Sequence, residues 1–150
     1  MVNSRPDLAY AWSILSQFST KPHRSHWQAT QHVLRYIHGT LDYGINYSGG
    51  DILVGYSDSD WAGCIDTRRS TLGYCFLLGG GLISWKSHKH CITSSSSTEA
   101  EYKAYLDATF EALWIQQILT HLGCTTLTST ILYSDSQSAI ALAKNPIVCG

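Results

Sequence analysis

One stretch decides the fold class, and it reads Ile52-Leu53-Val54-Gly55-Tyr56-Ser57-Asp58. Apolar side chains recur at every second position, in the set Ile52, Val54 and Tyr56. A period of two is typical of a β-strand, because successive side chains point to opposite faces of a sheet. We therefore predict a strand with this apolar set facing inward, and the same period turns the Asp58 carboxylate toward the buried face.

Patterns on both sides of this stretch predict an α/β fold. A shorter alternating segment precedes it, and two further strands follow it, connected by three glycines. A long helical pattern, one more strand and a short helix come next. A meander followed by helix, strand and helix predicts a mixed sheet. The expected strands are 43–47, 52–58, 73–78, 82–87 and 130–134, and the expected helices are 97–122 and 136–144.

Residues 1–42 carry a separate pattern of two helices, the first starting at Pro6 and the second ending at Gly39. The charge also differs along the chain. Four basic and two acidic residues precede position 51, whereas six basic and nine acidic residues follow position 50. We therefore expect a helical connector over 1–42 and an α/β domain over 43–150.

The composition excludes several classes of protein. The chain has 150 residues, of which 44% are hydrophobic and 14% charged, so it is a folded domain and not a disordered segment. The formal net charge of -1 excludes nucleic-acid binding by bulk positive charge. No apolar run approaches the roughly 20 residues of a membrane span. The five cysteines are odd in number and widely spaced, which favours reduced thiols and an intracellular location, in the cytoplasm or nucleus.

Three carboxylates stand at the ends of expected elements. Asp58 ends the strand quoted above, either as a site residue or as part of a turn. Glu101 begins an apolar stripe on the long helix, although a capping box with Thr98 is the alternative role. Asp135 comes directly before a helix, where it can act as an N-cap. If these carboxylates meet, their repulsion favours a hard divalent cation such as Mg²⁺ between them.

Five blocks stand in a fixed order along the chain. The first is Tyr56-Ser57-Asp58-Ser59-Asp60-Trp61-Ala62-Gly63, and the others are residues 68–74, 83–85, 96–102 and 134–140. In this order they resemble the ribonuclease H domain of copia-type LTR retrotransposon Pol polyproteins. Residues 5–10 and 34–41 resemble the segment that joins the reverse transcriptase of that family to its ribonuclease H. The resemblance covers nearly the whole chain.

The resemblance implies a ribonuclease H-like mixed sheet and two-metal cleavage of the RNA strand of RNA·DNA hybrids, with Mg²⁺ or Mn²⁺ as cofactor. By motif, the first three catalytic and metal-binding carboxylates correspond to Asp58, Glu101 and Asp135. In the family a segment with a fourth carboxylate follows, and this sequence stops at Gly150 before it. We therefore expect a domain without its C-terminal segment, weak metal binding, and little or no nuclease activity.

The sequence leaves a second functional class open. The chain is also similar to short copia-derived proteins that are classed as secreted effectors of plant pathogens. This similarity suggests a co-opted, non-catalytic protein, secreted into a host cell and acting on an unknown host protein. The segment His32-Val33-Leu34-Arg35 is at best a degenerate form of the Arg-x-Leu-Arg signature of such effectors.

Two weaker expectations concern other side chains. Lys86 and Lys89 form a short basic patch that could follow a nucleic-acid backbone, and a solvated loop explains it equally well. The tryptophans are most simply core residues, and they are Trp12, Trp27, Trp61, Trp85 and Trp114.

Overall fold

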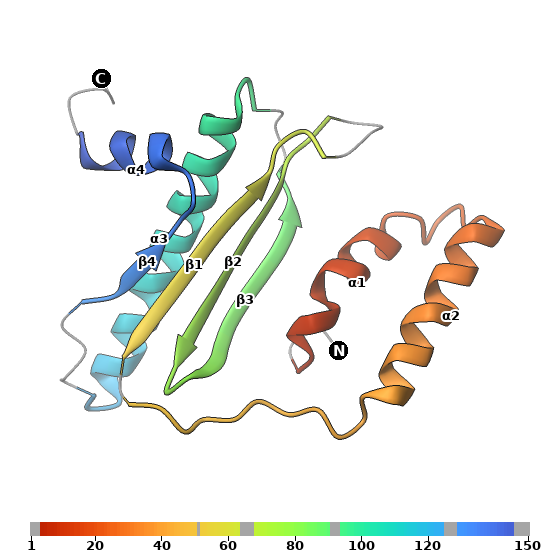
Figure 1. Cartoon of the computed structure of the whole chain (residues 1–150), viewed down its shortest axis with the longest axis horizontal. Coiled ribbons are helices and arrows are strands. Elements are labelled where there is room, and N and C mark those ends of the chain that lie inside the picture. The colour runs from red at the N-terminus through yellow and green to blue at the C-terminus, as the bar shows by residue number, and fades with distance from the viewer. Residues whose placement is uncertain (1–3, 51, 64–67, 91–93, 125–128, 146–150) are drawn as a thin grey trace. The chain divides into compact units, whose positions relative to one another are not determined.

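The structure is a computed structural model that describes residues 4–50, 52–63, 68–90, 94–124 and 129–145 (Figure 1). Its internal contacts divide the chain into two compact units, residues 1–45 and 46–150. Within the described residues, no helix combines the length and the apolar composition that crossing a membrane requires.

The first unit is a pair of helices. A short 3-10 turn, η1 (Pro6–Leu8), leads into α1 (Ala9–Ser16), and α2 (Arg24–Gly39) follows after a break. Proline starts the first segment because its fixed φ suits the first helical turn and its missing N–H costs nothing there. The two helices were both predicted from the sequence.

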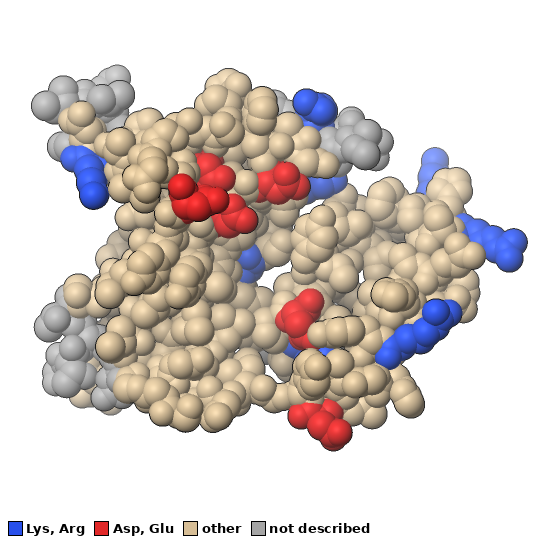
Figure 2. All heavy atoms as spheres, in the orientation of Figure 1, with Lys and Arg blue, Asp and Glu red and all other residues tan. Residues whose placement is uncertain are grey.

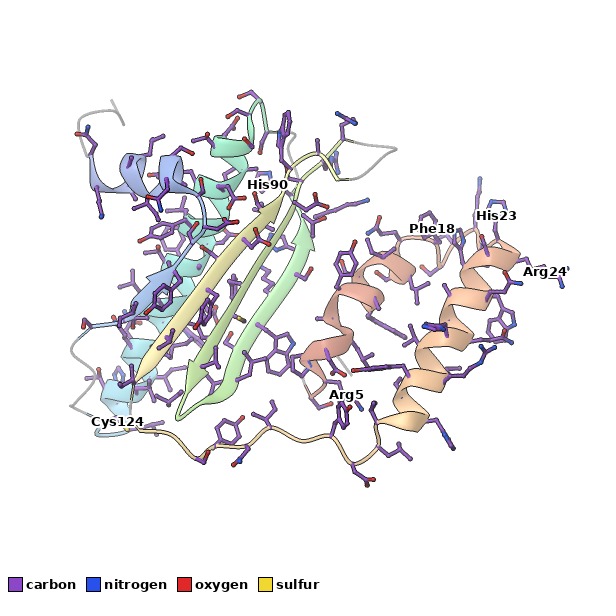
Figure 3. All side chains as sticks on the ribbon, in the orientation of Figure 1. Arg5, Phe18, His23, Arg24, His90 and Cys124 are labelled. Atoms are coloured by element: carbon purple, nitrogen blue, oxygen red, sulfur yellow. The ribbon has the colours of Figure 1, made fainter. Side chains whose placement is uncertain are left out.

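Contacts at the two ends of this hairpin hold the helices together. The Arg5 guanidinium donates to the Thr40 carbonyl oxygen at 3.1 Å and to Thr40 Oγ1 at 2.7 Å. The Phe18 ring stacks on the His26 ring with centroids 4.0 Å apart. Arg5 and Phe18 therefore mark opposite ends of the unit, as Figure 3 shows.

The second unit is built on a four-stranded sheet. Its strands are β1 (Leu53–Asp60), β2 (Thr71–Leu78), β3 (Gly81–Lys89) and β4 (Ile131–Tyr133). The spatial order is β3-β2-β1-β4, and β4 is parallel to β1 while the other neighbours are antiparallel. Helix α3 (Ser97–His121) connects β3 to β4, and α4 (Gln137–Lys144) follows β4. The predicted α/β fold with a mixed sheet is confirmed.

Helix α3 packs on one face of the sheet, and its small residues allow a close approach. Ala104, Ala108 and Ala112 are buried on the helix side. On the sheet side, Leu53 and Phe76 are fully buried in the same cluster. Because alanine side chains are small, they occupy little space between the helix and the sheet, and the two backbones come close together.

The buried face of β1 is opposite to the one we predicted. Leu53, Gly55 and Ser57 are buried against α3, whereas Ile52 and Tyr56 are exposed. A methyl group on Gly55 would overlap the Phe76 ring, so the tight packing lies on the glycine and serine side. The apolar set therefore lies on the open face of the sheet, and Asp58 is exposed with it.

Two other expectations were wrong. Residues 43–47 form no strand. The Tyr47 hydroxyl donates to the Leu82 carbonyl oxygen at 3.0 Å, so the contact of this segment with β3 is a side-chain hydrogen bond and not backbone pairing between strands. Four of the five tryptophans are exposed and not core residues, namely Trp12, Trp27, Trp61 and Trp114, and Trp85 is half-buried. Of the five cysteines, Cys75 and Cys124 are free, and the other three lie outside the described residues.

Candidate metal centre

Two carboxylates come together because β1 and β4 are parallel neighbours. Tyr56 of β1 pairs with Tyr133 of β4 in the ladder. Asp58 and Asp135 each come two residues later, Asp58 still within β1 and Asp135 just past the end of β4. Parallel strands carry the residues at their carboxyl ends to the same edge, so the two side chains are brought side by side.

Helix α3 supplies the third carboxylate. Glu101 lies in the first part of this helix, whose N-terminus is at the same end of the unit as the carboxyl end of β1 (Figure 1). One oxygen from each of Asp58, Glu101 and Asp135 lies within 4.8 Å of the other two. Figure 2 shows carboxylate atoms gathered in a patch at this end of the sheet. The structure thus brings together the three carboxylates that we singled out in the sequence.

The electrostatics of Glu101 fit a site for a cation. Its Oε2 atom is buried and has no hydrogen-bond partner among the described residues. Burial raises the pKa of its carboxyl group above the usual range, Ser59 acts in the opposite direction, and the charges of Asp58 and Asp135 raise the pKa further. An unpartnered carboxylate oxygen beside two more carboxylates is the donor set that a hard divalent cation such as Mg²⁺ or Mn²⁺ prefers.

The capping roles that the sequence allowed for Glu101 and Asp135 are wrong. The Ser96 hydroxyl caps α3 by accepting a hydrogen bond from the backbone N–H of Glu99 at 3.1 Å. The Ser136 hydroxyl caps α4 by accepting from the backbone N–H of Ala139 at 3.2 Å. Since serines satisfy these helix ends, neither site carboxylate is needed as a cap.

Asp58 is not a turn residue either. Strand β1 continues to Asp60, and Asp58 pairs with Gly73 of β2 in the ladder. Because Gly73 has no side chain, the space next to Asp58 on this face of the sheet stays open. The carboxylate is therefore held on regular strand backbone with room for a ligand.

Sequence reasoning missed one contact that supports the site. The indole Nε1 of Trp61, just after β1, donates to the Ser94 carbonyl oxygen at 3.2 Å. Ser94 precedes the cap of α3 by two residues, and Lys103 of α3 lies 3.5 Å from its hydroxyl. This contact links the strand that carries Asp58 to the helix that carries Glu101. The only signal in the sequence was a tryptophan beside the carboxylate motif.

An open groove of about 610 Å³ adjoins the carboxylates on the side away from α3. Asp58 and Asp135 form one end of its lining, and the exposed Lys86 also contributes to it. Lys89, at the end of β3, is only half exposed and pairs with Thr71. Of the two lysines predicted to contact nucleic acid, Lys86 alone lines this groove.

The mixed sheet, the helix across it and the three carboxylates, two from neighbouring strands and one from that helix, define a ribonuclease H-like α/β domain. Comparison with known proteins gives the family. Over 146 residues the chain is 43% identical to a retrovirus-related Pol polyprotein from transposon TNT 1-94 of Nicotiana tabacum, covering 97% of this chain and 11% of that protein. A Pol polyprotein from transposon RE2 of Arabidopsis thaliana is also 43% identical, over 96% of this chain and 10% of its own length.

The alignment with a shorter relative covers most of that relative's length. The chain is 52% identical over 117 residues to the secreted RxLR effector protein 161 of Plasmopara viticola, which amounts to 77% of this chain and 82% of that protein. The chain belongs to the copia-type retrotransposon Pol family. It spans about a tenth of the length of the Pol polyproteins that it matches. No protein-family model matches the chain, and no solved structure matches it.

Proposed function

We propose that this retroelement-derived domain keeps at most a weak ribonuclease H-type activity, which cleaves the RNA strand of RNA·DNA hybrids with Mg²⁺ or Mn²⁺. The observation that carries the proposal is the meeting of Asp58, Glu101 and Asp135, with their oxygens within 4.8 Å of one another. Such a cluster is unfavourable without a cation, since each carboxylate repels the other two. The family relationship to Pol polyproteins supports the choice of nucleic acid as substrate.

The three carboxylates would hold the cation in different ways. Asp58 and Asp135 are exposed at the groove, so their oxygens are accessible to a substrate phosphate as well as to the metal. Glu101 is partly buried and would hold the ion from the helix side. When bound, divalent ions in such sites activate a water molecule and stabilise charge on the leaving oxygen of a phosphodiester.

A cleavage assay tests this proposal. The full chain is incubated with an RNA·DNA hybrid labelled on the RNA strand, in Mn²⁺ and in EDTA. We expect weak cleavage that requires Mn²⁺, and we expect Asp58→Asn to abolish it. The matched control is Asp60→Asn, because Asp60 is an exposed carboxylate on the same strand and is not part of the cluster. Absence of Mn²⁺-dependent cleavage by the unmodified chain, or equal loss in both variants, would overturn the proposal.

A second candidate function rests on the relative from Plasmopara viticola. Because 82% of that protein, named as a secreted RxLR effector, aligns with this chain, a non-catalytic role in a host cell is the alternative. Residues 1–20 fused to a reporter test the secretory part of this idea. Export of the reporter supports the effector role, and retention in the producing cell contradicts this route. In host cells, an effector role that needs no catalysis is expected to survive Asp58→Asn unchanged.

A further inference from the structure

Two exposed aromatic rings stand side by side on the open face of the sheet. Tyr56 of β1 and Tyr133 of β4 are paired in the parallel ladder, and their rings stack with centroids 5.3 Å apart and planes 23° apart. Their exposed fractions are 47% and 51%, so neither ring belongs to the core. Since each ring packs against the other, the pair is held in place before any ligand arrives, while about half of each residue's surface stays exposed.

The pair adjoins the carboxylates. Asp58 lies two residues after Tyr56, and Asp135 two residues after Tyr133. Two residues of a strand span about 7 Å, so Tyr56 and Asp58 of β1 point to the same face of the sheet, and Asp135 lies just past the end of β4. All four side chains line the same groove of about 610 Å³, together with Lys86. The lining of this groove therefore suits a ligand with a flat apolar group next to a group that is charged or that binds cations.

Nucleotides have this combination of groups. A base is a flat ring that stacks on aromatic side chains, and it is attached to a phosphate, which carries the charge. In a duplex the base faces are already covered by their neighbours, whereas an unpaired base has a free face. The geometry of the groove therefore favours single-stranded nucleic acid over a duplex.

We propose that Tyr56 and Tyr133 form a stacking platform that binds an unpaired base of single-stranded nucleic acid next to the carboxylate cluster. The platform is a binding site of its own and goes beyond the cleavage of hybrids. Stacking needs no metal ion, so the platform binds whether or not the carboxylates support catalysis. Asp58 and Asp135 repel the phosphates of the strand, so neutralising one of them strengthens binding in the absence of metal.

A binding experiment without catalysis tests the platform. Fluorescence anisotropy of a short labelled oligothymidylate is measured with the full chain in EDTA, with the corresponding duplex as competitor. We expect Tyr56→Leu and Tyr133→Leu each to weaken binding roughly tenfold, because a stacked base loses its aromatic partner. Tyr56→Phe keeps the ring and is expected to retain the affinity. Asp58→Asn is expected to bind the oligonucleotide more tightly than the unmodified chain in EDTA.

The matched control is Phe110→Leu, which removes an exposed ring from α3 on the other side of the sheet. Its affinity for the oligonucleotide is expected to stay unchanged, and circular dichroism checks that every variant is folded. Two results would overturn the platform. One is an affinity that is the same for Tyr56→Leu, Tyr133→Leu and Phe110→Leu. The other is a dimer, seen by sedimentation, that Tyr133→Leu dissociates, because a second copy would then be the occupant of this face. Failure of hybrid cleavage leaves these readouts unaffected.

Discussion

Glu101 is predicted to destabilise the metal-free protein. Its carboxylate oxygen lies within 4.8 Å of oxygens of Asp58 and Asp135, and its Oε2 atom is buried without a hydrogen-bond partner among the described residues. Glu101→Gln keeps the shape of the side chain and removes its charge. In EDTA at neutral pH, we expect this variant to unfold at a higher temperature than the unmodified chain.

The magnitude follows from the distances. Two unit charges separated by 4.8 Å repel by about 1 kcal/mol in surroundings that resemble water, which suits the exposed Asp58 and Asp135. Removing the Glu101 charge relieves two such repulsions, or about 2 kcal/mol. For a domain of this size, that free energy corresponds to an increase in Tm of about 8 °C.

Thermal unfolding followed by circular dichroism measures the effect, and Mn²⁺ reverses it. A bound ion stabilises the folded state by about 2.7 kcal/mol at a concentration of 100 times its Kd. The unmodified chain therefore gains Tm when Mn²⁺ is added, whereas Glu101→Gln gains little because one ligand is missing. The order of the two Tm values is expected to change between EDTA and Mn²⁺.

Glu99 provides a matched control on the same helix turn. Hydrogen bonds from Lys103 and from Ser95 lower the pKa of the Glu99 carboxyl to about 2, so its charge is favourable. Glu99→Gln is therefore expected to lower Tm in EDTA, opposite to Glu101→Gln. If both variants lower Tm, repulsion at Glu101 is refuted.

The pH dependence gives a further check on Glu101. A raised pKa means that the neutral form is favoured in the folded state, so the destabilisation is absent below the ordinary pKa of glutamate and develops as the pH rises through the raised pKa. The difference in Tm between Glu101→Gln and the unmodified chain is therefore expected to close at acidic pH. A difference that stays constant from pH 3 to pH 7, roughly the range over which such a carboxyl ionises, would contradict this explanation.

Three further predictions concern the framework around the site. Trp61→Phe removes the hydrogen bond to Ser94, which contributes about 1 kcal/mol. We expect this variant to bind Mn²⁺ about fivefold more weakly in titration calorimetry. Unchanged affinity would show that this hydrogen bond does not position the site. Ser96→Ala removes the cap of α3 and is expected to cost about 1 kcal/mol in urea unfolding. Gly55→Ala places a methyl group against the Phe76 ring and is expected to cost about 2 kcal/mol by the same measurement, and a neutral effect would contradict the close packing there.

The order and type of the elements could be predicted because their patterns are local. The long helix was expected over 97–122 and spans Ser97–His121, since its apolar residues recur at helical spacing and a serine stands before it. The strands that pair in the sheet were also expected. Residues 43–47 alternate as a strand does, yet form none, because a strand also needs a partner and the pattern of one segment cannot supply it.

The buried face of β1 could not be predicted from its own side chains. Gly55 and Ser57 are buried on the face of β1 that packs against α3, and this packing depends on a helix more than 40 residues away in the sequence. The more apolar set, including Tyr56, is left on the open face. The pattern of apolar residues therefore predicted the two-residue period of the strand correctly, but it predicted the wrong face of β1 to be buried.

The candidate site shows the same division. That Asp58 and Asp135 would meet followed from two strand ends in one sheet, and their oxygens do lie within 4.8 Å of each other. That they bind a metal stays a prediction. The hydrogen bond from Trp61 to Ser94 could not be predicted, because its acceptor is a backbone carbonyl, which every residue has.

Strand β1 divides its residues between two tasks. The positions that face α3, such as Leu53 and Gly55, hold the unit together, whereas the alternate positions Tyr56 and Asp58 face the groove and bury little. A substitution scan along this strand is therefore expected to lower stability at the positions that face α3, and to lower the proposed metal and nucleic-acid binding at the positions between them. In a lineage of such domains, mutations at the groove positions would remove the proposed catalysis and leave the fold intact. The fold is then available for binding roles that need no metal at all.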